Sequence, residues 1–281
     1  MANINNFGII GGDKRQLYCG KSAIDDGYGV YICGFEKCGT MLGVENSDLK
    51  TTLADSDAFI LPLPVTKDGL TLNAPLSDNT IFLDRLFELA ENKPVFCGMA
   101  NKLPFDRKNI FDYSAREEFA VANAVPTSEG AIETAMLEYD GTINNSKCLV
   151  TGYGRIGRVL SDMLAGLGAD VSVSARNLKD LEYIKAKGFH ALYTDNIHGK
   201  FDIIFNTVPY MIFNAHILAK TAQNALVIDL ASMPGGVDFK SAERLNIRAV
   251  HALSLPGKVA PKTSGIIIKN AVCNIIREEN L

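Results

Sequence analysis

The sequence of 281 residues has no tryptophan, only four histidines and no Cys-x-x-Cys pair. Zinc and other transition metals need clusters of these ligands, so we expect no bound metal. Cysteines without such spacing are expected to be reduced thiols, most of them buried in a core. They are Cys19, Cys33, Cys38, Cys97, Cys148 and Cys273.

Long hydrophobic runs and blocks of like charge are missing as well. No stretch reaches the roughly 18 uninterrupted apolar residues of a membrane helix, and the N-terminus, MANINNFGIIGG, lacks the basic start of a signal peptide. We therefore expect a cytoplasmic protein without a membrane span. The formal net charge of -4 is spread along the chain, which argues against nucleic acid or anionic lipid as a partner.

The pattern that is present is an alternation of short apolar runs with amphipathic stretches. This alternation is typical of βαβ units and largely parallel sheets, and a length of about 150 residues per domain indicates two α/β domains. The first half has expected strands at Phe7–Ile10, Gly29–Gly34, Ala58–Leu63, Pro94–Gly98 and Asn109–Tyr113, with a helix at Asn79–Glu91. The second half has expected strands at Cys148–Thr151, Asp170–Ser174, Asp202–Asn206 and Ala225–Leu230.

The segments that flank the second half are expected to contain helices. Before it, one short helix is expected at Ala115–Asn123, and Pro126 is expected to start a second helix. After His251, the run Leu-Pro-Gly-Lys is expected to form a loop, followed by a last helix at Ser264–Glu278.

A glycine-rich turn follows the first strand of the second half, where residues 148–157 read CLVTGYGRIG. Gly-x-Gly-x-x-Gly between a strand and a helix is the dinucleotide-binding fingerprint of the Rossmann fold. Gly152 would permit the tight turn, Gly154 the approach of a pyrophosphate, and Gly157 the packing of helix on strand. The backbone amides of Arg155 and Ile156 would face the phosphates at the positive end of the helix. A glycine turn without a ligand is the alternative.

The end of the next strand bears on which nicotinamide cofactor is bound. NAD enzymes place a carboxylate there, about 20 residues after the glycines, to bind the ribose 2′-hydroxyl. Here the strand ends in Ser174-Ala-Arg176, without a carboxylate. Ser174 and Arg176 could bind a 2′-phosphate, so we expect NADP, with NAD as the other candidate. A solvated surface arginine is the alternative for Arg176.

Two later runs are expected to contact the nicotinamide half of the cofactor, because ligands of doubly wound sheets lie beyond the carboxyl ends of the strands. The first run is NTVP at residues 206–209, and the second begins at Asp229. Asp229 could bind a ribose or cap the turn that follows it. The other expected contacts are Asn206, Thr207, Val208, Pro209 and Ala231.

These patterns predict two Rossmann-like, three-layer α/β domains with parallel sheets, joined by helices and separated by a cleft. Residues 1–125 would form a substrate or partner domain, 126–145 a connecting helix, and 146–250 the Rossmann NAD(P)-binding domain. Residues 251–281 would supply a cleft loop and a C-terminal helix that packs back toward the N-terminal domain.

Several runs of the sequence resemble a known family. They are Ile9–Gln16, Arg116–Ala131, Phe205–Pro209, Asp229–Gly236 and His251–Thr263. The last two are also similar to stretches of alanine dehydrogenase and of 2-hydroxy acid dehydrogenases. In combination, and over nearly the full length, the runs resemble the A-subunit family of dipicolinate synthases.

That resemblance implies an NAD(P)-dependent oxidoreductase of sporulation. Such an enzyme forms pyridine-2,6-dicarboxylate (dipicolinate) from dihydrodipicolinate or hydroxytetrahydrodipicolinate. The resemblance also implies a partner, the separate, flavoprotein-like B subunit of dipicolinate synthase, and a homo-oligomer remains open.

Oxidation of such a dicarboxylate requires groups that hold two carboxylates and a group that removes a proton. The candidates for the first task are Arg15 after the first glycine turn, Arg116 in the connection, and Lys258 and Lys262 in the expected cleft loop. His251 is the candidate base, because the ordinary pKa of histidine suits proton transfer near neutral pH. Each of these residues could instead be an ordinary surface residue.

Two other functions remain open from the sequence alone. One is a stand-alone dehydrogenase of the alanine or 2-hydroxy acid type, although such enzymes commonly use a histidine with a carboxylate partner, and the first domain has no histidine. The other is a protein that senses the cofactor without chemistry. Asp13, Glu117 and Glu118 are rival acid or base groups.

Overall fold

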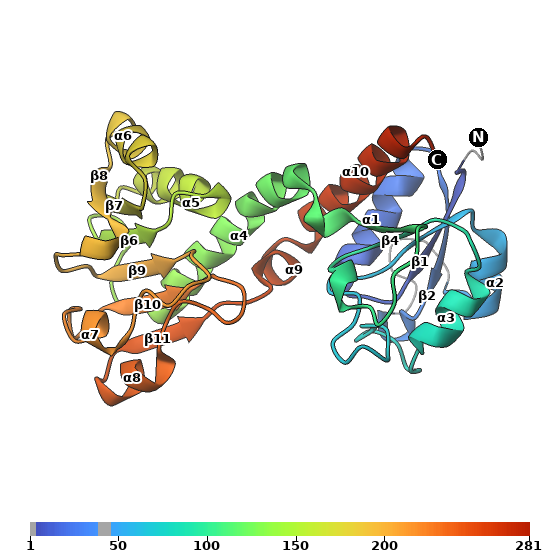
Figure 1. Cartoon of the computed structure of the whole chain (residues 1–281), viewed down its shortest axis with the longest axis horizontal. Coiled ribbons are helices and arrows are strands. Elements are labelled where there is room, and N and C mark those ends of the chain that lie inside the picture. Colours follow the sequence, from blue (N-terminus) through green and yellow to red (C-terminus); the bar gives the residue numbers. More distant parts are fainter. Residues whose placement is uncertain (1–3, 39–45) are drawn as a thin grey trace. The chain divides into compact units, whose positions relative to one another are not determined.

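The computed structural model describes residues 4–38 and 46–281, which form two units (Figure 1). Unit 1 contains residues 1–123 and 260–281, and unit 2 contains residues 124–259. Each unit is built around one sheet whose described strand pairs are parallel. The predicted fold class, two Rossmann-like α/β domains with parallel sheets, is confirmed.

The sheet of unit 1 has the strand order β2-β1-β3-β4-β5. Its strands are β1 (Asn6–Ile10), β2 (Gly29–Cys33), β3 (Ala58–Ile60), β4 (Val95–Cys97) and β5 (Ile110–Asp112). The helices are α1 (Lys14–Asp25), α2 (Leu49–Asp55), α3 (Leu83–Leu89) and α10 (Pro261–Glu279), with short 3-10 helices η1 (Glu36–Cys38), η2 (Ala100–Lys102) and η3 (Tyr113–Ala115). The strand order reverses between β1 and β3, and sheets of this kind bind ligands beyond the carboxyl ends of that pair.

Helix α3 is shorter than the helix expected at Asn79–Glu91. Residues Ile81 and Phe82 are extended instead, because the Leu72 amide donates to the Ile81 carbonyl (2.9 Å) and Thr71 forms an antiparallel bridge with Phe82. The amphipathic spacing predicted the helix, and this pairing with a distant segment shortened it.

The C-terminal helix α10 packs against α1 in unit 1, where Figure 1 shows the two side by side. Small residues permit the close approach: a Cβ on Gly265 would lie 2.5 Å from the Arg15 carbonyl oxygen. The largely buried Lys269 forms an ion pair with Asp26 of the α1 C-cap. The apolar faces of the two helices, including Leu17 of α1 and Val272 of α10, belong to the same core.

The sheet of unit 2 has the strand order β8-β7-β6-β9-β10-β11. Its strands are β6 (Lys147–Thr151), β7 (Asp170–Ala175), β8 (His190–Tyr193), β9 (Ile203–Asn206), β10 (Leu226–Asp229) and β11 (Arg248–His251). The helices are α5 (Arg155–Gly166), α6 (Leu178–Ala186), α7 (Ala215–Leu218), α8 (Phe239–Arg244) and α9 (Leu255–Val259), with the 3-10 helix η4 (Thr194–Asn196). In chain order this is 3-2-1-4-5-6, the order of dinucleotide-binding Rossmann domains, and its switch point lies between β6 and β9.

Two further local expectations were wrong, and two strands were missed. The two helices expected around Pro126 are one helix, α4 (Glu117–Glu138). A proline removes only a single backbone hydrogen bond, and buried residues on either side of it, such as Ala124 and Ala131, keep the helix packed. The loop expected after His251 is helical: Lys258 lies in α9, and Lys262 follows the proline that starts α10. The outer strands β8 and β11 were not predicted, because their short, partly exposed runs lack a long apolar signal.

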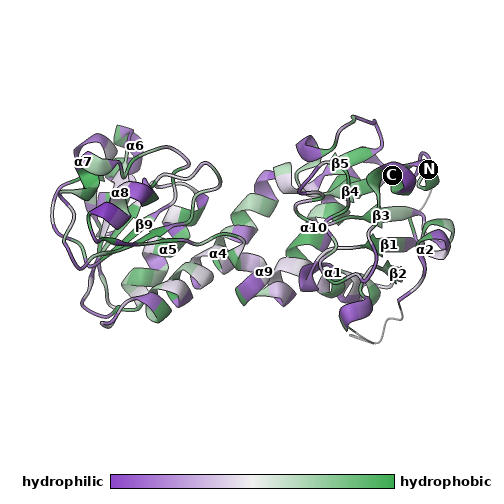
Figure 2. Ribbon diagram, turned by 90° about the horizontal axis from the view of Figure 1, so that it is seen from below, coloured by the Kyte–Doolittle hydropathy of each residue, from purple (hydrophilic) through white to green (hydrophobic). Residues whose placement is uncertain are grey.

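The buried side chains form cores on the faces of both sheets, and Figure 2 shows hydrophobic residues following the strands. Four of the six cysteines are buried, and all six are free thiols.

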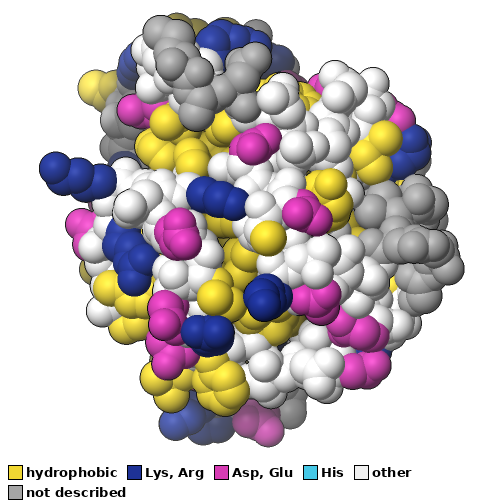
Figure 3. Space-filling view, turned by 90° about the vertical axis from the view of Figure 1, so that its right-hand side faces the viewer, with side chains coloured by type: hydrophobic (Ala, Val, Ile, Leu, Met, Phe, Trp, Pro, Cys, Tyr) yellow, Lys and Arg dark blue, Asp and Glu magenta, His cyan; other side chains and the backbone are white. Residues whose placement is uncertain are grey.

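On the face drawn in Figure 3, lysine and arginine side chains are interspersed with aspartate and glutamate side chains. Over the described ranges, no helix combines the length and apolarity needed to cross a membrane.

Candidate functional site

The glycine-rich turn of unit 2 leads from β6 into α5. Gly152 has a positive φ of 92°, which an L-residue seldom adopts, and a Cβ on Gly157 would lie 2.0 Å from the Gly152 carbonyl oxygen. A Cβ on Gly154 would meet nothing within 4 Å, and this residue caps α5 without any side-chain hydrogen bond. Gly152 therefore serves the turn, Gly157 serves packing, and Gly154 leaves the N-terminus of α5 open to a ligand.

A cavity of about 850 Å³ lies at this edge of the sheet, within the range of about 300–1,000 Å³ that is usual for small-molecule sites. It brings together the glycine turn, the ends of β7 and β8, and the loop after β9. The predicted cofactor residues that line it are Gly152, Gly154, Arg176, Thr207, Val208 and Pro209. The open helix N-terminus and this cavity fit a dinucleotide.

The end of β7 was expected to bind the ribose. Ser174 is buried, and its hydroxyl accepts a hydrogen bond from the Thr194 hydroxyl (3.3 Å). Arg176 is exposed at the cavity and forms no ion pair with the part of the chain that the structure describes. Its guanidinium is thus available to an anion that enters the cavity.

Two carboxylates at the same cavity were missed. Asp180 accepts hydrogen bonds from the side-chain amide of Asn177 (2.7 Å) and from Arg158 (3.4 Å). Asp195 lies exposed just after β8. Its position follows from a strand that the sequence did not reveal, so only the fold could place it at the same cavity as Arg176.

The run that starts at Asp229 is held by a buried network. Asp229 is fully buried, and its carboxylate accepts hydrogen bonds from the Asn206 side chain (2.8 Å) and the Ala231 (3.2 Å) and Gly236 (2.8 Å) amides. Asn206 is also fully buried and accepts a hydrogen bond from the Thr151 hydroxyl (2.6 Å). Both side chains therefore orient the loops after β9 and β10. Of the two roles left open for Asp229, the geometry favours the structural one.

The remaining predicted cofactor residues, Arg155, Ile156 and Ala231, are not among the residues that line the cavity. Ile156 packs partly buried against the core of unit 2, and Ala231 is buried. Arg155 is the first residue of α5, directly after the open cap at Gly154.

His251 lies at the end of β11, outside the cavity lining. Its Nε2 is 3.2 Å from the Ala231 carbonyl oxygen, and its ring lies 5.5 Å from that of Phe239. Lys258 on α9 and Lys262 on α10 are both exposed. Within unit 1, Arg15, Arg116 and Lys262 form no hydrogen bond or ion pair with one another among the described residues, and the same holds within unit 2 for His251 and Lys258.

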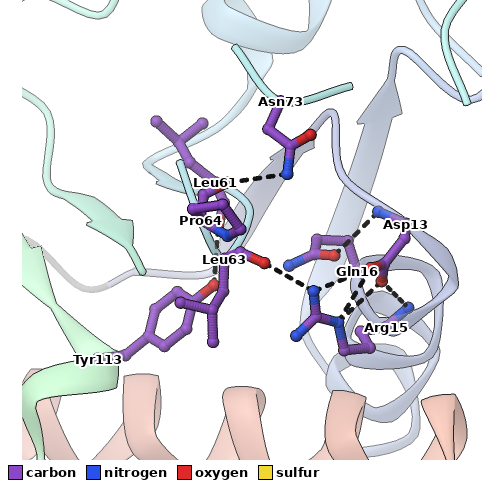
Figure 4. Close-up of polar contacts among 8 residues, drawn as sticks. All are labelled: Asp13, Arg15, Gln16, Leu61, Leu63, Pro64, Asn73 and Tyr113. Atoms are coloured by element: carbon purple, nitrogen blue, oxygen red, sulfur yellow. Dashed lines mark hydrogen bonds and ion pairs between the residues drawn. The ribbon is translucent and has the colours of Figure 1, made fainter. Parts of the chain in front are cut away.

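Arg15 lies at the carboxyl end of β1 in unit 1, and Figure 4 shows its contacts. The guanidinium forms a two-pronged ion pair with Asp13, with Nε 2.9 Å and Nη2 2.9 Å from the carboxylate oxygens. Nη2 also donates to the Leu63 carbonyl after β3 (2.6 Å). Only 11% of the side chain is exposed, so Arg15 is a fixed, nearly buried cation.

Arg116 is placed differently. Its guanidinium binds Glu118 (2.8 Å) and Glu278 of α10 (2.6 Å). The hydrogen bonds to Glu118 and then to Glu278 raise the pKa of Arg116. Two carboxylates already balance this cation, so it is a weaker anion site than Arg15.

The described residues contain no group of three or more histidine, cysteine, aspartate or glutamate side chains that could hold a metal ion.

The chain is similar to known proteins along its length. Residues 6–105 match the family model of the N-terminal domain of the dipicolinate synthase A subunit, and residues 120–233 match that of the NAD binding domain of D-isomer specific 2-hydroxyacid dehydrogenases. The dipicolinate synthase A subunit of Bacillus subtilis (strain 168) is 33% identical over 282 residues, covering 96% of this chain and 95% of the relative.

Solved structures agree with this similarity. The crystal structure of the dipicolinate synthase A subunit from Bacillus halodurans superposes with a TM-score of 0.86 and 29% identity, covering 97% of each chain. The transhydrogenase of Sinorhizobium meliloti shares the fold, with a TM-score of 0.70 and 15% identity over 97% of this chain and 94% of that one. Unit 2 contains an NAD-binding domain of the dehydrogenase type. The chain belongs to the A-subunit family of dipicolinate synthases.

Proposed function

We propose that this chain is the NAD(P)-dependent oxidoreductase subunit of a dipicolinate synthase. It would form dipicolinate from dihydrodipicolinate, which hydroxytetrahydrodipicolinate yields on loss of water. The observation that carries the proposal is an open dinucleotide cavity in a chain that is similar over its full length to dipicolinate synthase A subunits.

A bound oxidised nicotinamide supplies the acceptor for a hydride, so conversion of dihydrodipicolinate to dipicolinate removes one hydride and one proton from the ring. The chain must then hold two carboxylates and accept the proton. Arg15, Arg116, Lys258 and Lys262 are the candidates for the carboxylates. His251 is the candidate base: when Nε2 donates to the Ala231 carbonyl, Nδ1 is left as the acceptor.

NADP is the proposed cofactor, with NAD as the alternative. The support is an exposed Arg176 without an ion pair to any described residue, directly after a strand whose carboxyl end carries no carboxylate. Asp195, at the end of the next strand, opposes a 2′-phosphate and is the residue that favours NAD.

The proposed setting is the cytoplasm of a sporulating cell, with the flavoprotein-like B subunit of dipicolinate synthase as partner. The similar proteins are named as one subunit of a synthase, which supports a multi-subunit enzyme.

The test is absorbance at 340 nm while dihydrodipicolinate synthase supplies substrate to this protein with NADP or NAD, with and without the B subunit. We expect reduced cofactor to appear together with the ultraviolet bands of dipicolinate, faster with NADP. Tight cofactor binding without reduction in any combination would contradict the enzyme and favour the cofactor sensor.

A further inference from the structure

An unpartnered donor lies at the carboxyl ends of β1 and β3 in unit 1. We propose that Gln16, with Arg15, binds one carboxylate of the substrate at this edge, an inference that rests on the function proposed above for the identity of the ligand.

Gln16 is fully buried, and its Nε2 is the one buried side-chain nitrogen or oxygen in the described part of the chain without a hydrogen bond. The orientation of this amide is determined by its neighbour, because Oε1 accepts the Asp13 backbone N–H at 3.2 Å. The group left over is therefore the NH2 donor. Buried polar groups of native proteins almost always have a partner, so this donor calls for an acceptor from outside the chain.

Arg15 offers the second donor. Nε and Nη2 of its guanidinium are taken by Asp13 and by the Leu63 carbonyl. Nη1 makes no hydrogen bond to the described residues, and it is not among the buried unpartnered atoms. In Figure 4, this nitrogen and the Gln16 amide nitrogen point to the same side, toward Leu63. A carboxylate has two oxygens and could accept from both donors.

Asp13 acts as the positioning residue for both donors. Its backbone N–H holds the Gln16 amide oxygen, and its carboxylate holds the Arg15 guanidinium and accepts the Arg15 backbone N–H (2.9 Å). The N-terminus of α1 is thus occupied by a carboxylate of the chain itself. An incoming anion must be met by side chains, and two donors beside a partly balanced cation suit a carboxylate better than a phosphate.

Hydrogen bonds also hold the loop after β3, to which Arg15 donates through the Leu63 carbonyl. The Tyr113 hydroxyl donates to the Leu61 carbonyl (3.0 Å), and the Asn73 side chain donates to the Pro64 carbonyl (3.1 Å). Because this loop after β3 is held on both sides, Leu63 keeps Arg15 in place without a ligand. The site also spans β1 and β3, the pair at which the strand order reverses, where sheets of this type bind ligands.

The chain offers a direct readout, because Gln16 and Gln223 are its only two glutamines. The full-length protein labelled with 15N in glutamine side chains would show two NH2 pairs in an NMR spectrum. The Gln223→Glu variant assigns them, since Gln223 lies in unit 2. Titration with pyridine-2,6-dicarboxylate is expected to shift the Gln16 pair saturably and to leave the Gln223 pair in place.

The matched substitution is Gln16→Glu. Glutamate is a usual residue at this position of a capping box, so the acceptor for the Asp13 N–H is retained and only the donor is replaced by an acceptor. Calorimetry should show pyridine-2,6-dicarboxylate binding at least tenfold more weakly. A probe with one carboxylate changed to an amide, 6-carbamoylpyridine-2-carboxylate, should lose much less affinity. The wild type should therefore prefer the dicarboxylate, and Gln16→Glu should prefer the amide probe. Lys14→Gln, on an exposed neighbour, shifts the net charge by the same unit and should change neither affinity by more than twofold.

The outcomes separate this inference from the proposed function. If the wild-type protein oxidises dihydrodipicolinate but the Gln16 signals stay in place at saturating dicarboxylate, the donor binds only water and the inference is overturned. If the Gln16 pair shifts but no cofactor is reduced with any substrate, the carboxylate site stands and the proposed oxidation fails. Cofactor affinity of Gln16→Glu should equal that of the wild type, because the cofactor cavity lies in unit 2.

Discussion

In both units a helix begins directly after the first strand of the parallel sheet, and the residue that caps this helix differs between the units. In unit 1 the residue that caps α1 is Asp13, whose carboxylate accepts a backbone N–H of the helix. In unit 2 the residue that caps α5 is Gly154, which has no side chain to do so. The positive end of α1 therefore holds an anion of the chain itself, whereas the positive end of α5 remains available to a phosphate. The residue at the cap therefore decides whether the helix N-terminus can bind a phosphate, as at Gly154, or whether an anion must be bound by side chains, as at Asp13.

The largest effect is expected when unit 2 receives the cap of unit 1. Gly154→Asp places a carboxylate where the pyrophosphate should bind, and the backbone at φ -82° accepts an L-residue without strain. We expect NADP and NAD affinity to fall by at least about 100-fold, while the free energy of unfolding stays equal or rises through the new cap. Calorimetry and urea unfolding measure the two quantities.

Gly154→Ser is the control for this substitution, since it adds a cap without a charge. Its cofactor affinity should lie between those of the wild type and Gly154→Asp. Wild-type affinity in Gly154→Asp would show that the dinucleotide does not use the N-terminus of α5.

A second prediction concerns the packing of α5 against the glycine turn of unit 2. Gly157→Ala would place a Cβ 2.0 Å from the Gly152 carbonyl oxygen, so α5 must move away from β6. We expect the free energy of unfolding to drop by about 1–3 kcal/mol and cofactor binding to weaken with it.

Gly166→Ala, at the other end of α5, is the matched control because its Cβ would meet nothing within 4 Å. Helix propensity should make this variant more stable by up to about 1 kcal/mol. Equal stability of the two alanine variants in chemical denaturation would contradict the packing role of Gly157.

Arg176→Ala tests whether a residue outside α5 also binds a phosphate of the cofactor. If this guanidinium binds the 2′-phosphate, NADP affinity should fall about tenfold, or about 1.4 kcal/mol, while NAD affinity changes little. Lys179→Ala removes the same charge from a neighbouring residue outside the cavity lining and should leave the ratio of the two affinities unchanged. Parallel losses for both cofactors in Arg176→Ala would reject the phosphate role.

The smallest effect on cofactor affinity is expected from the cap of unit 1. Asp13→Ala removes the α1 cap and the partner of Arg15, and we expect a loss of about 0.5–2 kcal/mol in the free energy of unfolding. Asp13→Asn keeps a capping side chain and should lose less. Cofactor affinity should remain that of the wild type in both, which calorimetry checks; a loss there would mean that the two helix starts do not have the separate roles argued above.

Much of unit 2 was predictable because its signals are local. Strand, glycine turn and helix follow one another within about ten residues, and the run from Thr207 to Pro209 was expected at the cofactor site from its place at a strand end. The structure puts those residues on the lining of one cavity with Gly152 and Arg176. The carboxylate Asp195 was missed because strand β8, which it follows, had not been recognised, and Asp180 was missed although it lies on the helix after β7.

The candidate substrate residues were the least predictable. The sequence offered Arg15 and Arg116 alike as candidates for a substrate carboxylate. In the structure, Arg15 is held by Asp13 and the Leu63 carbonyl, and Arg116 is held by Glu118 and Glu278. Lys258 was expected in a loop and lies in a helix. Each of these outcomes depends on a partner or a packing surface that is distant in the chain.

By itself the sequence determined the two parallel-sheet units, the glycine turn and the absence of a carboxylate at the end of β7, because strand alternation and glycine backbone freedom act between near neighbours. Only the tertiary structure decided that Asp229 orients a loop, that α4 continues through Pro126, and that Gln16 keeps an unpartnered donor. Those properties follow from burial, and burial brings together groups that the sequence keeps far apart.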